Sequence, residues 1–179
     1  RGNHDPLDEH PGFPLLRTVE DWTRERLGPE RVAQLSALPL ELEIDLDGQR
    51  LLCVHGSPSG MTDQVLDTTP WPKLAAWWGG RTFDVMACGH THVQVLRRRH
   101  GHTVVNVGSV GQPFAEAFNG KPPRVLKCCD YAIVEGGPAG VSVELRRAAL
   151  PWDAFVQTLY DADFPSPERW LQQWHRTPE

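Results

Sequence analysis

The stretch Leu51-Leu52-Cys53-Val54-His55-Gly56 is an apolar run that ends in a histidine, and it has a counterpart further along the chain. Residues 83–88 form a second short and largely apolar run, which leads into Gly89-His90-Thr91-His92. Short apolar runs of this kind, bounded by glycine, predict buried strands. The histidines then lie where each strand passes into a loop, so both strands deliver imidazoles to the edge of a sheet.

Hairpin and helix signals surround these two strands. Residues 40–44 alternate apolar and acidic side chains, Asp47-Gly48 supplies a tight turn, and residues 50–54 return as an apolar strand. Because strands and helices interleave and neighbouring strands are joined by hairpins, we expect a mixed α/β architecture with layered sheets. The chain of 179 residues is long enough for one domain with a hydrophobic core, spanning residues 1–179. The remaining predicted strands form two pairs: 93–99 with 103–107, joined by a turn at His100-Gly101, and 131–134 with 141–145. A helix at 18–27 ends at Gly28, and Pro29 suits the first turn of a second helix at 30–38. Further helices are predicted at 72–78 and after Pro151 and Pro167.

The composition excludes some classes of protein. Hydrophobic residues make up 40% and charged residues 23% of the chain, which is ordinary for a globular protein. No apolar run reaches the length of a membrane span, so we expect no membrane-spanning segment. A formal net charge of −5 argues against a broad nucleic-acid-binding surface. A small phosphate substrate stays compatible with this charge, because bound dications would dominate the local field.

The four cysteines do not form the pattern of a disulfide framework. Cys53 and Cys88 lie in predicted buried strands, Cys128 and Cys129 are adjacent, and no C-x-x-C spacing occurs. We therefore expect a reducing, cytoplasmic setting.

Four side chains are candidate metal ligands: Asn3, His55, His90 and His92. Neutral imidazole nitrogens together with an amide oxygen suit Zn, Fe, Mn or Ni. On a loop after a strand, with Gly89 permitting a close turn, the two neighbouring histidines can each reach one of two metals. Two metals about 3.5–4 Å apart can clamp the attacking and leaving oxygens of phosphoryl transfer. A single histidine at a strand end is more often an ordinary loop residue, so the prediction depends on all three blocks occurring together.

His4 and its neighbour Asp5 are a candidate catalytic pair. An imidazole oriented by a carboxylate can stay protonated, stabilise charge on a phosphoryl group and give a proton to the leaving oxygen.

Two other clusters favour ordinary structural roles. The basic run Arg97-Arg98-Arg99-His100 predicts a solvated hairpin turn rather than a phosphate clamp. The tryptophans of residues 71–78 predict helix–sheet packing rather than the lining of a substrate groove.

Taken together, Gly2-Asn3-His4-Asp5, His55-Gly56 and Gly89-His90-Thr91-His92 resemble the last three of the five motifs of the calcineurin-like metallophosphoesterases. The segments at 54–58 and 106–113 are similar to a bacterial branch described as diadenosine tetraphosphatase-like or protein-phosphatase-like. The resemblance implies a layered α/β/β/α sandwich with a two-metal centre at the sheet edge. It also implies the site residues: Asn3, His55 and His90 on one metal, His92 on the other, His4 as the catalytic imidazole and Asp5 as its partner.

The sequence departs from the family pattern in two places. The first two motifs, D-x-H and G-D-x-x-D, are expected ahead of residue 1; Asp8-Glu9-His10 follows the third motif, and we interpret its D-x-H spacing as coincidence. Two strand–helix units of about 30 residues each would carry these motifs, so we expect roughly 60 residues upstream. Where related sequences have Pro and Arg, this chain has Val107 and Phe114, so the role of the Asn106–Arg124 loop stays open.

The expected function is hydrolysis of phosphate mono- or diesters, nucleotides included, by a hydroxide activated by two divalent metal ions. The alternative is a non-catalytic binding scaffold on the same fold with an incomplete metal site. Metal ligands contact the phosphate that all these substrates share, so they do not distinguish one substrate from another. The oligomeric state also stays open.

Overall fold

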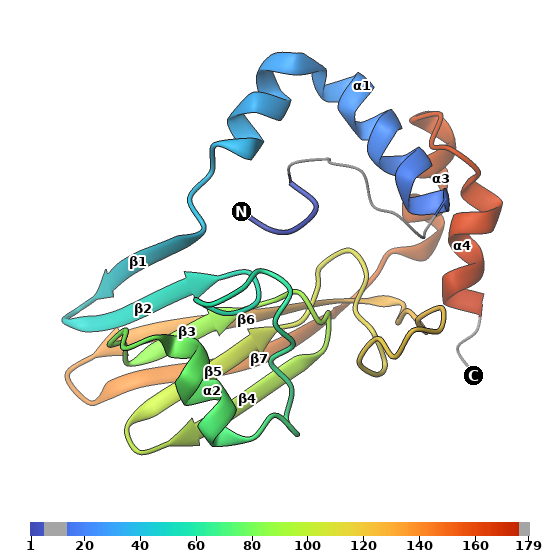
Figure 1. Ribbon diagram of the computed structural model, residues 1–179. Helices are drawn as coiled ribbons and strands as arrows, with labels where there is room; N and C mark the ends of the chain where they lie inside the picture. Colours follow the sequence, from blue (N-terminus) through green and yellow to red (C-terminus); the bar gives the residue numbers. More distant parts are fainter. Residues whose placement is uncertain (6–13, 176–179) are drawn as a thin grey trace.

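The computed structural model describes residues 1–5 and 14–175 (Figure 1). Every strand and helix predicted from the sequence is present within these residues, which confirms the mixed α/β fold class. The strands are β1 (Glu41–Leu46), β2 (Gln49–Val54), β3 (Val85–Cys88), β4 (Gln94–Arg99), β5 (His102–Val107), β6 (Cys128–Gly137) and β7 (Gly140–Ala149). The helices are α1 (Pro14–Ser36), α2 (Trp71–Trp78), α3 (Trp152–Asp161) and α4 (Pro167–His175).

The main sheet has five strands in the order β1-β2-β3-β5-β4. Its three inner strands, β2, β3 and β5, are parallel, while β1 and β4 are antiparallel strands joined to their neighbours by hairpins. Since the inner strands run in one direction, their carboxyl ends meet at one edge of the sheet. The residues that follow these ends are His55, Gly89 and Gly108. The predicted site residues therefore start from adjacent strands.

A second sheet and a helix cover the two faces of this main sheet. Leu51, Val85 and Val105 face a two-stranded sheet of β6 and β7. Their sequence neighbours, Leu52 and Met86 among them, face the opposite side and pack with Leu74 and the tryptophans of α2. Successive strand residues point to opposite faces, so a strand with both faces covered must be apolar throughout. The prediction that the α2 tryptophans pack helix against sheet is confirmed.

Helix α1 consists of two helical segments joined at a kink. Gly28 lies at the kink with φ 74° and ψ 166°, and Pro29 begins the second segment. A positive φ favours glycine, and proline suits the first turn of a helix, so the sequence explains the break. Figure 1 shows α1 arching over residues 1–5, which lie between it and the sheets.

The two C-terminal helices form a separate cluster beside one end of the sheets (Figure 1). Trp174 is 1% exposed and packs with Leu159, Leu171 and Val125. The cluster also contacts α1, because Trp22 and Phe164 stack edge to face at 5.3 Å.

Cys53, Cys88, Cys128 and Cys129 are all free thiols, as the absence of a disulfide pattern predicted. In the part of the chain that the structure describes, no helix is both long and apolar enough to cross a membrane.

Candidate metal centre

Asn3 lies between the ends of β2 and β3 and contacts a histidine from each. His55 Nε2 donates to Asn3 Oδ1 at 2.7 Å, and His90 Nδ1 donates to the same oxygen at 3.2 Å. The two rings meet edge to face with centroids 5.3 Å apart. Residues 52 and 87 positions away from Asn3 thus converge on one amide oxygen.

Burial favours the neutral form of the histidines. Burial, followed by the nearby His90, lowers the pKa of His55 to about 4. Burial also lowers the pKa of His90 and of His92, with the charge of His4 or His90 adding to the effect. Removing an imidazole from water disfavours its charged form, and metals bind the neutral one. The electrostatic surroundings therefore favour ligand chemistry.

His92 is oriented by the loop that follows β5. Its Nδ1 donates to the Gln112 carbonyl at 2.8 Å, and its ring stacks on Phe114 with centroids 4.5 Å apart. In a neutral ring this leaves the lone pair on Nε2. Metal-binding histidines are typically oriented in this way, with one nitrogen donating to a backbone carbonyl and the other on the metal. Gln112 acts through its backbone, so its side chain gave no signal in the sequence.

His4 pairs with a residue that sequence reasoning missed. Its Nδ1 donates to Glu20 Oε1 at 2.8 Å, from a side chain that is 49% exposed to a carboxylate that is 6% exposed. Asp5, the expected partner, instead accepts from the Gly2 N–H at 2.5 Å. Glu20 lies on α1, and nothing in its sequence neighbourhood distinguishes it from a surface glutamate. The predicted roles of His4 and Asp5 stay predictions.

Gly2 and Gly56 allow close packing around the site. A Cβ on Gly2 would lie 2.9 Å from the His55 ring, so this position brings the N-terminal segment against the imidazole. A Cβ on Gly56 would lie 2.6 Å from the Met61 carbonyl oxygen, where the 56–61 turn folds back on the strand end. Both contacts are closer than a side-chain carbon tolerates, which explains why glycine stands at each position.

The donor atoms fit one divalent cation better than two. Asn3, His55 and His90 offer an amide oxygen and two imidazoles within one small region, a combination that suits Mn, Fe, Zn or Ni. Among the described residues, however, no three His, Cys, Asp or Glu side chains form a group that could hold a metal ion. The structure brings together the predicted ligands of the first metal, and for the second it places only His92, in a ligand-like orientation.

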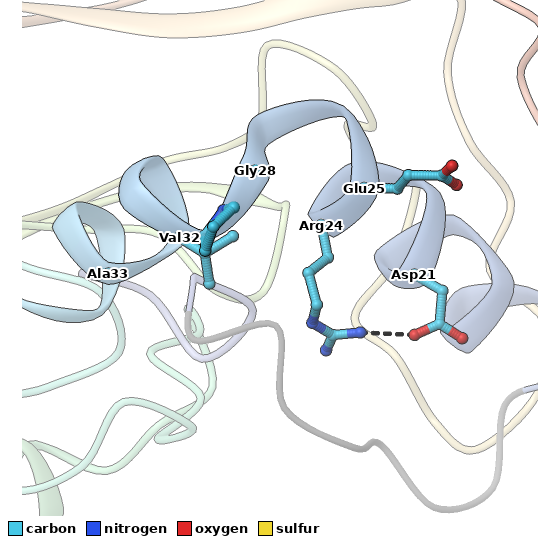
Figure 2. A pocket seen from close by; sticks show the side chains of 7 residues that line it. Asp21, Arg24, Glu25, Gly28, Val32 and Ala33 are labelled. Atoms are coloured by element: carbon cyan, nitrogen blue, oxygen red, sulfur yellow. Dashed lines mark hydrogen bonds and ion pairs between the residues drawn. The ribbon is translucent and has the colours of Figure 1, made fainter.

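A separate hollow of about 580 Å³ lies at the kink of α1 (Figure 2). Arg24 and Asp21, one turn apart on α1, line it and form an ion pair at 2.6 Å, and Gly28 and Val32 form another part of its wall. None of the residues predicted for the metal centre lines this hollow. It carries no catalytic group of the kind that the histidine cluster contains.

Comparison with known proteins relates both the motifs and the fold to one group. A family model described as the calcineurin-like phosphoesterase superfamily domain matches residues 1–126. A hypothetical protein from Pyrococcus horikoshii OT3 has a TM-score of 0.71 at 18% identity, over 93% of this chain and 68% of that protein. A metallophosphoesterase from Sphaerobacter thermophilus has a TM-score of 0.64 at 24% identity, over 92% of this chain and 71% of that one. At these identities the structural likeness describes the fold, and no curated protein matches the chain.

Proposed function

Because the chain belongs to the calcineurin-like phosphoesterase superfamily, we propose that its site hydrolyses phosphate esters with the help of divalent metal ions. The observation that carries the proposal is the convergence of His55 and His90 on Asn3 Oδ1. The substrate class is a small phosphate mono- or diester, nucleotides included. The finer resemblance to one bacterial branch stays a prediction.

The residues divide into ligands and a proton donor. Asn3, His55 and His90 would hold one cation, and His92 is oriented to bind a neighbouring one through Nε2. Bound divalent cations supply Lewis-acid stabilisation of the phosphoryl group and lower the pKa of water. His4, with its Nδ1 on Glu20, would give a proton from Nε2 to the leaving oxygen.

A second candidate function is a non-catalytic binding scaffold on the same fold. One observation favours it: within residues 1–5 and 14–175, no group of three His, Cys, Asp or Glu side chains could hold a metal ion. A surface with one weak cation site could bind a partner without turning over a substrate.

Metal binding and turnover together separate the two functions. We expect the protein to bind Mn²⁺ in a calorimetric titration and to hydrolyse bis-p-nitrophenyl phosphate or p-nitrophenyl phosphate. Chelation with EDTA should abolish turnover, and added Mn²⁺ should restore it. Binding without turnover on either substrate would support the scaffold, and absence of Mn²⁺ binding would contradict the proposed metal-dependent function.

A further inference from the structure

We infer that Asn106 is a positioning residue that fixes the direction of His90 and His92. Asn106 lies near the C-terminal end of β5 and is 0% exposed. Its side-chain hydrogen bonds are to the loops around the histidines and not to either imidazole. The expected effect of Asn106 on metal affinity rests on the proposed function, whereas its role in holding the histidine loop does not.

The amide group of Asn106 joins the β3 loop to the β5 loop. Its Nδ2 donates to the Gly89 carbonyl at 2.7 Å and to Thr91 Oγ1 at 2.8 Å, with the Val65 carbonyl at 3.3 Å. Its Oδ1 accepts from the Gly108 N–H at 3.2 Å. The reverse orientation of the amide would set its oxygen against two carbonyl oxygens, so the arrangement specifies one rotamer.

The loop held in this way has an unfavourable backbone. His90 and His92 lie at φ 64° and 59°, a left-handed conformation that non-glycine residues rarely adopt. Between them, Thr91 is 5% exposed and its N–H donates to the Gly89 carbonyl at 2.7 Å. Such conformations persist only where the surrounding structure specifies them. The Asn106 contacts to Gly89 and Thr91 flank His90 and supply that constraint.

The side-chain oxygen of Asn106 also constrains the position of His92, through the loop after β5. Gly108 begins the segment that leads to Gln112, whose carbonyl accepts a hydrogen bond from His92 Nδ1 at 2.8 Å. Gly108 has φ 79°, and a Cβ there would lie 2.6 Å from Asp130 Cβ, so this turn has little freedom to shift. One buried side chain therefore determines the geometry on both sides of the histidine pair. Only an amide offers two donors and an acceptor in this volume: aspartate lacks the donors, and leucine lacks both.

The test compares Asn106→Ala with Val104→Ala. Val104 lies two residues earlier on the same strand and the same face, and it is also 0% exposed, so its truncation destabilises the same core without touching the loop. For each protein, we would measure the melting temperature, Mn²⁺ affinity by calorimetry, and amide hydrogen exchange of Thr91 relative to Val105 in the metal-free state. Thr91→Val is a third variant, which removes one acceptor of the amide and leaves Asn106 in place.

Asn106→Ala should weaken Mn²⁺ binding by about 10- to 100-fold, the effect typical of residues that orient metal ligands. It should also speed Thr91 exchange relative to Val105. Val104→Ala should lower the melting temperature while leaving Mn²⁺ affinity and Thr91 exchange unchanged. Thr91→Val should weaken Mn²⁺ binding and speed exchange of the amide at position 91, compared with Thr91 of the unaltered protein after correction for the intrinsic exchange rate of each residue type. If Asn106→Ala does not fold, Thr91→Val decides the question.

Two results would overturn the inference: wild-type Thr91 exchange in Asn106→Ala, or an equal loss of Mn²⁺ affinity in Val104→Ala. If the unaltered protein binds no Mn²⁺, the proposed function fails, and the exchange of Thr91 alone decides whether Asn106 holds the loop.

Discussion

Histidines with a left-handed backbone occur at both edges of the main sheet, yet only one edge has the properties of a site. His100 lies at the β4–β5 turn with φ 50°, next to Gly101 at φ 81°, and its side chain is exposed. This pair of positive φ values belongs to the tight hairpin turn itself. At the carboxyl edge, His90 and His92 adopt the same conformation, but there it comes with partial burial, a lowered pKa and hydrogen bonds that the imidazoles donate to Asn3 Oδ1 and the Gln112 carbonyl. Backbone conformation alone does not mark a site; convergence and burial do.

The largest effect on turnover is expected when a histidine at the carboxyl edge is replaced, with the same replacement at the opposite edge as the comparison. Asparagine tolerates a left-handed backbone, so His90→Asn keeps the turn while it removes a ligand imidazole. We expect turnover of bis-p-nitrophenyl phosphate to fall by about 10³-fold, or about 4 kcal/mol of transition-state stabilisation. Mn²⁺ affinity, measured by calorimetry, should fall with it.

His100→Asn is the matched control for this comparison. Its turnover and Mn²⁺ affinity should stay within about twofold of the unaltered protein, because exposed substitutions rarely exceed about 0.5 kcal/mol. Similar losses in both variants would show that the two edges do not differ in function.

A smaller effect is expected at His4 and Glu20, which lie beside the metal ligands. His4→Ala should lower turnover by about 10²-fold while Mn²⁺ stays bound, since a general acid contributes about that much. Glu20→Gln should lower turnover by about tenfold, because the imidazole keeps its position but loses its carboxylate partner.

The double variant distinguishes a shared role from two separate ones. If Glu20 acts through His4, the double variant should be no slower than His4→Ala alone. Additive losses would contradict this coupling, and unchanged turnover in His4→Ala would remove the catalytic role of His4.

Gly2→Ala should have a moderate effect on the N-terminal side of the site. The added methyl group would lie 2.9 Å from the His55 ring and push Asn3 or the imidazole away. We expect a loss of about 1 kcal/mol, which is about fivefold in Mn²⁺ affinity. Gly111→Ala is the control, since a Cβ there would meet nothing within 4 Å. Equal affinities in the two variants would show that residues 1–5 do not pack against His55 as described.

The smallest effect is expected at the opposite edge, in the basic cluster around the β4–β5 turn. Arg98→Ala should leave the KM for p-nitrophenyl phosphate within about twofold and the stability within about 0.5 kcal/mol. A rise in KM of tenfold or more would mean that the cluster contacts the phosphate and that both edges serve the substrate. Arg97 is unsuitable for this test because its guanidinium stacks on Trp71 at 4.6 Å and bonds the Leu66 carbonyl at 3.1 Å.

The elements that the sequence predicted correctly are those with local signals. The hairpins followed from Asp47-Gly48 and His100-Gly101, and the kink in α1 from Gly28-Pro29. The strand order could not be predicted from the sequence, because the pairing of β3 between β2 and β5 joins residues far apart in the chain. Helix α1 also begins at Pro14, earlier than the predicted residue 18, and β6 and β7 extend past their predicted apolar cores.

In the site, residue type explains what could be predicted. Asn3, His55 and His90 carry donor atoms that suit a metal, and the structure places them together. Glu20 and Gln112 were not identified: one is an ordinary helix glutamate brought to His4 by the arch of α1, and the other contributes only a backbone carbonyl. Both residues are brought to the site by the tertiary structure, and the local sequence around them carries no signal of it.

The most direct test of the metal centre is an anomalous difference map from crystals of the protein soaked in Mn²⁺. We expect a peak in contact with Asn3 Oδ1 and with one ring nitrogen each of His55 and His90. A map without a peak at these three atoms, or with its strongest peak elsewhere on the molecule, would contradict it.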